Sequence, residues 1–458
     1  FFGSWAQVVW LKTVAASKLF ALMNPLPPRH PVDRQQTART SFLDAINAHD
    51  LACSGLHRLE QPLEEFPQFR YNIVTGTWAL VTCGMDADKP RDYKPSAECD
   101  QPTHLRPEVS DSFDPFALTN EHLTPPEKLS HMDPSGNGKK MIRVFDNKFP
   151  LLSRLDCSAE TPNIQARFDD SMHPQLSGVG ICEVVVQHWK FGMCQALMKN
   201  EEACLLWQSL RDRALALSGK SGVRYVQCFE NHGIKSGGSL RHPHSQLFAL
   251  PFVPSEQKNR LDLAKKFWDL SGLNIFDHIL QHVADAKMGD RKLFADGNVV
   301  AFVPWSVERG YEFWVVPRDA GAKFLDASDD LINSIATAVS YCLHLLYLAK
   351  DDPDYNVMVR TVPVDADDEA DEWYRWHVCV LPSINSWGGV IQSGFVVTTQ
   401  PEKTASHLRE QEGKPLPVPT EKTTPERLQR TMLVAPGILA LIGLCLAGSL
   451  WRKRSGHS

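Results

Sequence analysis

The chain has 458 residues, of which 43% are hydrophobic and 22% are charged. This composition excludes a disordered chain and supplies a sizeable core, with room for two large domains or about three average ones. Acidic residues outnumber Lys and Arg by 54 to 48, and the formal net charge of -6 argues against a nucleic-acid partner. The 11 cysteines contain no C-x-x-C pair, so we expect neither a disulfide framework nor a zinc module built on paired thiolates.

Residues 1–34 form an apolar and basic N-terminal segment in which the first acidic residue is Asp33. Three interpretations of residues 1–23 stay open: a spanning helix, an amphipathic helix on a membrane surface, or the remnant of a targeting segment. A proline-rich break at residues 24–31 separates this stretch from the rest of the chain.

Strand and helix patterns then follow in two similar series. In the first series, residues 70–82 contain two β-rich runs around a Thr-Gly pair, which predicts a hairpin. Residues 200–218 carry an apolar face at helical spacing that ends at Gly219, and strands are predicted on either side of this helix. Those two strands cover residues 183–186 and 223–229.

The second series repeats this order. A helix is predicted over residues 328–348, with Ser328 as its N-cap, and three strands surround it. These strands cover residues 299–304, 312–317 and 376–381. The acidic run at residues 365–372 predicts a solvated loop. The repetition indicates an α+β fold with two units built around antiparallel sheets, at residues 35–255 and 256–412.

The C-terminal end has the composition of a membrane anchor. Residues 413–430 form a proline-rich tether, and residues 431–451 contain an uncharged run that is long enough to cross a bilayer as a helix. Residues 452–458 form a basic tail. We therefore expect a single-pass C-terminal transmembrane helix in an organelle membrane. The basic, acid-free start and the basic tail favour the mitochondrion.

The segment with the clearest chemistry is residues 229–254. Its glycine-rich loop can present backbone N–H groups and a hydroxyl to phosphate oxygens. His242, His244 and Gln246 follow at a spacing of two, so on a strand they would share one face beside this loop. A neutral imidazole beside bound phosphate can attack phosphorus. An isolated H-x-H would more often be a pair of core histidines, but the loop and Gln246 at fixed offsets favour a nucleotide site.

These residues belong to three short motifs: Asn231-His232-Gly233, Ser236-Gly237-Gly238-Ser239 and His242-Pro243-His244-Ser245-Gln246. Together the motifs resemble the active-site signature of the galactose-1-phosphate uridylyltransferase family, a branch of the histidine-triad superfamily that includes ADP-glucose phosphorylase. The resemblance extends over about residues 65–410, through segments at residues 70–78, 124–127, 144–150 and 376–382. It implies a tandem pair of histidine-triad-like α+β domains with antiparallel sheets.

The resemblance also implies roles for individual residues. His244 would attack the α-phosphorus of a nucleoside diphosphate sugar, release a sugar 1-phosphate, and pass the nucleotide to a second phosphate acceptor. Gln246 and Ser239 would hold phosphate oxygens and complete the catalytic set. The nucleotide-binding residues that the resemblance implies are Asn147, Asn231, Gly237, Gly238, Lys89 and His242.

Two departures from the family pattern stand out. The family holds a structural zinc with two cysteines and two histidines, but the matching positions are Asp114, Ala117 and Phe191, so only His242 remains. One ligand does not hold zinc, and we predict no metal and no cofactor. The segment that should contact the phosphates contains two aspartates beside Lys89, which weakens the attraction for a diphosphate. A local shift of register would bring Arg91 there instead.

Two functions stay open at this point. The first is a membrane-anchored nucleotidyltransferase that works through His244 on a nucleoside diphosphate sugar. The second is a non-catalytic accessory (supernumerary) subunit of an organellar membrane complex that reuses the transferase fold, with other membrane-protein subunits as partners. The anchor, the lost zinc ligands and the acidic phosphate segment favour the second function, and a nucleotide sensor without turnover lies between the two.

Overall fold

The computed structural model describes residues 57–58, 68–72 and 77–81 as backbone strands. It describes residues 114–158, 162–167, 173–283, 290–384 and 400–416 more fully. The predictions for residues 1–34, for Lys89 and for the transmembrane helix at residues 431–451 lie outside the described residues.

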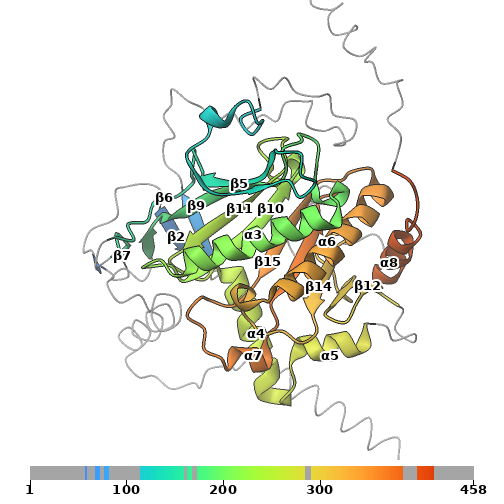
Figure 1. Cartoon of the computed structure of the whole chain (residues 1–458). Coiled ribbons are helices and arrows are strands. Elements are labelled where there is room, and N and C mark those ends of the chain that lie inside the picture. The colour runs from blue at the N-terminus through green and yellow to red at the C-terminus, as the bar shows by residue number, and fades with distance from the viewer. Residues whose placement is uncertain are drawn as a thin grey trace, which may run out of the picture.

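A large, mostly antiparallel sheet runs through the middle of the protein (Figure 1). Its strands follow the order β12-β13-β14-β16-β15-β10-β11-β9-β5-β4, with the short β6 paired to β9. The strands from the first half of the chain are β4 (Glu127–Met132), β5 (Lys140–Asp146), β6 (Ser153–Arg154), β9 (Val179–Val186), β10 (Tyr225–His232) and β11 (His244–Leu250). Those from the second half are β12 (Lys292–Ala295), β13 (Val299–Phe302), β14 (Phe313–Pro317), β15 (Tyr355–Arg360) and β16 (His377–Pro382).

The two halves of the chain meet inside this sheet. Strands β10 and β15 pair antiparallel, with Phe229 opposite Met358 and His232 opposite Tyr355. One continuous sheet therefore contains both of the predicted α+β series. The domain boundary placed between residues 255 and 256 stays a prediction.

A smaller sheet lies beside the large one in the order β1-β7-β8-β2-β3. The hairpin predicted over residues 70–82 is confirmed, because β2 (Gln68–Asn72) and β3 (Thr77–Val81) pair antiparallel with Asn72 opposite Thr77. The remaining strands are β1 (His57–Arg58), β7 (Gln165–Arg167) and β8 (Gln175–Ser177).

Two long helices, α3 (Asn200–Ser218) and α6 (Asp329–Lys350), lie side by side across one face of the large sheet (Figure 1). Both were predicted from apolar periodicity, and α3 ends at Gly219 as expected. The N-cap of α6 is also confirmed, since the Ser328 hydroxyl accepts a hydrogen bond from the Leu331 amide at 3.3 Å. The other helices are α4 (Ser255–Ser271), α5 (Ile275–His282), α7 (Ala370–Trp373) and α8 (Pro401–Arg409).

Helix α6 is the one helix in the described part of the chain that is long and apolar enough to cross a membrane. Of its most apolar window, 56% is buried inside the protein. Ile335, Val339 and Cys342 on its inner face have no exposed surface. We therefore interpret α6 as a core helix.

The acidic side chains of the run at residues 365–372 are exposed to solvent, as predicted. Its last residues differ from the prediction, because they enter the short helix α7 instead of staying in a loop. The Asp371 carboxylate accepts a hydrogen bond from the Ala322 amide at 2.6 Å, and Ala370 is buried. This contact ties the run to the segment before α6, a partner that lies too far away in sequence for the local charge pattern to indicate.

Candidate nucleotide site

Strand β11 places His244 and Gln246 at one cavity. The strand is held on both sides, with Gln246 opposite Phe229 of β10 and opposite Val184 of β9. His244 and Gln246 both line a cavity of about 560 Å³. Four of the other predicted site residues line the same cavity: Asn147, Asn231, Gly237 and Ser239. We call this space the nucleotide cavity.

His242 lies outside the nucleotide cavity, contrary to the prediction that it shares a face with His244. Strand β11 begins only at His244, so the alternation of side chains does not extend back to His242. The His242 ring is buried, with Nδ1 2.7 Å from Asp114 Oδ2 and Nε2 2.7 Å from the His188 carbonyl oxygen. The ring packs edge-on against Phe116, a wall residue of the cavity, with centroids 5.8 Å apart.

The His244 ring is held in one tautomer. Its Nδ1 lies 2.9 Å from the carbonyl oxygen of His242, which can only accept, so Nδ1 carries the proton. Nε2 therefore keeps its lone pair. Burial lowers the pKa of His244 below its ordinary value of 6.5, and this effect outweighs the hydrogen bond to the His242 carbonyl oxygen, which raises the pKa. The result is a neutral imidazole with one nucleophilic nitrogen.

The glycine loop follows β10 as a short 3-10 turn, η5 (Ile234–Ser236). Gly237 closes the turn with a φ of +85°, a conformation that favours glycine. Gly238 does not line the cavity. It packs so closely that an added Cβ would lie 2.7 Å from the Gly233 carbonyl oxygen and 2.8 Å from that of Asn231.

The close approach at Gly238 leads to a first prediction. We expect Gly238→Ala to push the loop away from its backbone neighbours and to weaken nucleotide binding by roughly tenfold. Equilibrium binding of a labelled nucleotide to the folded variant measures this loss. Gly219→Ala is the matched control, because nothing lies within 4 Å of the Cβ position there. Equal affinity of Gly238→Ala and wild type would contradict the close-packing argument.

Residues from the second half of the chain hold this loop by hydrogen bonds. The sequence did not predict these contacts. The Asn356 side-chain amide of β15 donates to Asn231 Oδ1 and to the Ser236 carbonyl oxygen, both at 2.8 Å. The Ser236 hydroxyl lies 3.0 Å from the Ser383 hydroxyl, which also accepts from Arg309 at 2.7 Å. The contacts of Asn356 and Ser383 with this loop span more than a hundred residues of sequence, so no local motif carries them.

Much of the wall of the nucleotide cavity is apolar. Phenylalanine rings form a large part of it, and the Asn147 side chain, which also lines the cavity, accepts a hydrogen bond from the Phe149 amide at 2.9 Å. The wall residues of this type are Phe116, Phe145, Phe149, Phe229 and Phe248. An apolar wall with a few polar groups suits a ligand that has a flat base and a phosphate.

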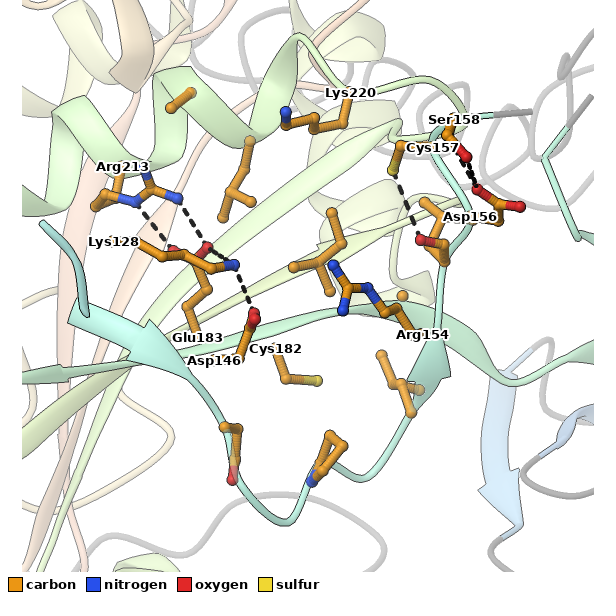
Figure 2. A pocket seen from close by; sticks show the side chains of 18 residues that line it. Lys128, Asp146, Arg154, Asp156, Cys157, Ser158, Cys182, Glu183, Arg213 and Lys220 are labelled. Carbon is orange, nitrogen blue, oxygen red and sulfur yellow. Dashed lines mark hydrogen bonds and ion pairs between the residues drawn. The ribbon is translucent and has the colours of Figure 1, made fainter. Parts of the chain in front are cut away.

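A second cavity of about 1020 Å³ lies on the opposite face of β5 and β9 (Figure 2). Phe145 and Val184 line the nucleotide cavity, whereas their neighbours Asp146 and Glu183 line this one, since side chains alternate along a strand. The fully buried Glu183 carboxylate accepts from Lys128 at 2.8 Å and from Arg213 at 2.8 and 3.0 Å. Lys128 also binds Asp146, and these ion pairs fix the end of β5 just before Asn147.

The position that would hold the family zinc contains residues that do not fit a metal. Both His242 ring nitrogens already face oxygen partners, on Asp114 and on the His188 backbone. The Phe191 ring packs edge-on against His242 with centroids 5.9 Å apart, and Ala117 is buried. Neither phenylalanine nor alanine offers a ligand atom. A carboxylate–imidazole contact therefore occupies the place where the resemblance would put a zinc ion.

Comparison with known proteins agrees with this geometry. Residues 59–254 match the model of the N-terminal domain of galactose-1-phosphate uridyl transferase. The chain is 25% identical to ADP-glucose phosphorylase from Arabidopsis thaliana, over 75% of this chain and 93% of that protein. It is 23% identical to galactose-1-phosphate uridylyltransferase from Thermotoga maritima, over 75% of this chain and 98% of that protein.

Solved structures show the same fold. A crystal structure of an ADP-glucose phosphorylase from Arabidopsis thaliana with bound ADP-glucose has a TM-score of 0.55 at 21% identity, and covers 66% of this chain and 92% of its own. A uridylyltransferase structure has a TM-score of 0.57 at 18% identity, and covers 75% of this chain and 98% of its own. The tandem histidine-triad description stays a prediction. Residues 59–254 thus match the N-terminal domain model, and the solved structures show that the chain shares the fold of these proteins.

Proposed function

We propose that the protein transfers a nucleotide from a nucleoside diphosphate sugar to a second phosphate acceptor through His244. One observation carries this proposal: a buried, neutral imidazole with its Nδ1 proton held by the His242 carbonyl lines the same cavity as Gln246, Ser239 and Gly237. The relatives support the donor class, because one of them is named ADP-glucose phosphorylase and its structure contains ADP-glucose.

The reaction has two steps that mirror each other. His244 Nε2 attacks the α-phosphorus, a P–N bond forms, and the P–O bond to the sugar phosphate breaks, so the sugar 1-phosphate leaves with the electron pair. The modified ring is stabilised because its Nδ1–H still donates to the His242 carbonyl. An acceptor phosphate oxygen then attacks the same phosphorus and releases His244. Gln246 and Ser239 hold non-bridging oxygens in both steps.

Isotope exchange tests this function on the full chain. A ping-pong enzyme exchanges labelled glucose 1-phosphate into ADP-glucose or UDP-glucose without any second acceptor, because the first step is reversible. We expect exchange with at least one of the two donors. Absence of exchange from detergent-purified and from membrane-embedded protein would contradict the transferase and favour the accessory subunit of a membrane complex.

The lowered pKa of His244 predicts a pH profile. The nucleophile is lost as pH falls through the pKa of the folded protein, and burial places that pKa below 6.5. We therefore expect the rate of nucleotidyl-enzyme formation to stay constant around pH 7 and to decline only below pH 6.5. Single-turnover labelling across pH measures this profile. An acid limb centred above pH 6.5 would show that the imidazole is not desolvated as described.

We propose separately that the protein is attached to an organelle membrane, with the mitochondrion as the first organelle to test. The uncharged run at residues 432–450 and its basic flanks support it. We expect alkaline carbonate to leave the full chain in the membrane fraction and to release a variant that lacks residues 413–458. Release of the full chain would contradict a spanning anchor.

A further inference from the structure

A cluster of metal-ligating side chains lies behind the glycine loop. It contains Cys194, His232 at the end of β10, and Asp352 just after α6. One ligand atom from each residue lies within 4.8 Å of the other two. Only 0%, 4% and 5% of their respective surfaces are exposed. His232 Nε2 and Asp352 Oδ1 are 2.8 Å apart.

Glu230 adds a second carboxylate close to this cluster. It precedes His232 by two residues on β10, so both side chains point to the same face of the strand. Only 2% of its surface is exposed. Its Oε2 accepts from the Gln195 amide at 2.5 Å, and Gln195 in turn accepts from Trp207 Nε1 at 2.9 Å. This chain of hydrogen bonds fixes the carboxylate, as neighbours of metal ligands commonly do.

A second cluster of possible metal ligands consists of Asp133, His188 and Glu202. Hydrogen bonds to residues outside this cluster already use donor atoms of His188 and Asp133. His188 Nδ1 accepts a hydrogen bond from the Lys190 amide at 2.9 Å, so the proton of its neutral ring is on Nε2, the nitrogen that faces Glu202 at 3.7 Å. No lone pair is left for a metal between these carboxylates. Asp133 Oδ2 is already held by Trp189 and Asn137, each at 2.7 Å.

We propose that Cys194, His232 and Asp352 bind one Zn²⁺. A thiolate, an imidazole and a carboxylate are all ligands that zinc accepts, and three protein ligands leave the fourth tetrahedral position to a water molecule. The sulfur and nitrogen donors disfavour Mg²⁺ and Ca²⁺, which select oxygen. Zinc binding releases the thiol proton of Cys194 to solvent. The site is unrelated to the cysteine and histidine positions of the family zinc.

The metal would stabilise the phosphate loop from behind. His232 is followed by Gly233, where the loop begins, and Asp352 lies two residues before Asp354. The Asp354 carboxylate accepts a hydrogen bond from the Lys235 amide within the loop at 2.5 Å. One ion would therefore tie the end of β10 to the α6–β15 turn, and this turn holds the loop.

Elemental analysis of the full chain tests the site. Protein exposed to Zn²⁺ and then dialysed against metal-free buffer should retain about one zinc per chain. We expect Cys194→Ser and Asp352→Asn to lose most of it. Cys204→Ser is the matched control, because Cys204 is a half-buried thiol on α3 outside the cluster.

Two further readouts separate zinc loss from misfolding. Cobalt-loaded wild type and Cys204→Ser should show a sulfur-to-cobalt charge-transfer band that Cys194→Ser lacks. A chelator should lower the Tm of wild type and leave the Tm of folded Cys194→Ser unchanged. Wild type without zinc, or Cys194→Ser with unchanged zinc and an unchanged cobalt spectrum, would overturn the proposal. Zinc that disappears in Glu202→Gln and stays in Asp352→Asn would assign the metal to the other cluster.

Discussion

His244→Ala is expected to reduce nucleotide transfer by roughly 10⁴-fold or more, since it removes the atom that forms the covalent bond. The exposed surface of His244 is only 6%, and its ring donates to a backbone carbonyl and packs edge-on against Phe116 at 5.3 Å. Alanine leaves the pairing of β11 with β9 and β10 in place, so the circular dichroism spectrum should be unchanged. Steady-state transfer and isotope exchange should fall together.

The matched control is His282→Ala. His282 is an exposed histidine at the end of α5, far along the chain from the nucleotide cavity. We expect it to retain wild-type exchange. A His244→Ala variant that keeps exchange within about tenfold of wild type would show that another group is the nucleophile, and the ping-pong account would then be wrong.

Asp114→Ala is expected to lower the free energy of unfolding by about 3 kcal/mol, because it leaves the buried His242 ring without its carboxylate partner. The side chains of Asp114 and His242 are 5% and 1% exposed, and their contact is 2.7 Å long. The Asp114 carboxylate also accepts from the Phe116 amide at 3.0 Å. Urea unfolding at pH 7, followed by far-ultraviolet circular dichroism, measures the loss.

Two substitutions calibrate this result. Asp114→Asn keeps an oxygen acceptor for the His242 ring and should cost less than Asp114→Ala. Asp269→Ala removes an exposed carboxylate whose partner Lys265 lies 3.3 Å away, and should change stability by about 0.5 kcal/mol or less. If Asp114→Ala is no more destabilising than Asp269→Ala, the buried contact between Asp114 and His242 contributes no more to stability than an exposed ion pair.

Local signals in the sequence were enough to predict the two long helices, α3 and α6. The apolar face of α3 and its terminal Gly219, and the Ser328 cap of α6, act within a few residues of each other, so the predicted ends match the structure closely. Strand β9 was predicted only over residues 183–186, but it starts at Val179. Its first residues include a glycine, which weakens a strand pattern although the pairing with β11 extends back to Ile181.

Long-range contacts account for what the sequence did not predict. The pairing of β10 with β15 joins the two series into one sheet, and nothing local in either strand specifies that partner. The glycine loop and His244 were found because their motif is contiguous. Asn356, which holds both Asn231 and the Ser236 carbonyl, was missed because it lies more than a hundred residues away. The prediction that His242 lines the nucleotide cavity was wrong, because its ring binds Asp114, a residue that lies outside the motif.

Mapping the covalent intermediate tests the central claim most directly. Full-length protein would be incubated with ADP-glucose or UDP-glucose labelled at the α-phosphorus, denatured and digested at neutral to alkaline pH, and the labelled peptide sequenced by mass spectrometry. The account predicts one acid-labile nucleotide on the peptide that contains His244, released again when sugar 1-phosphate is added. A stable label on another residue, or no label with either donor, would contradict nucleotidyl transfer through His244.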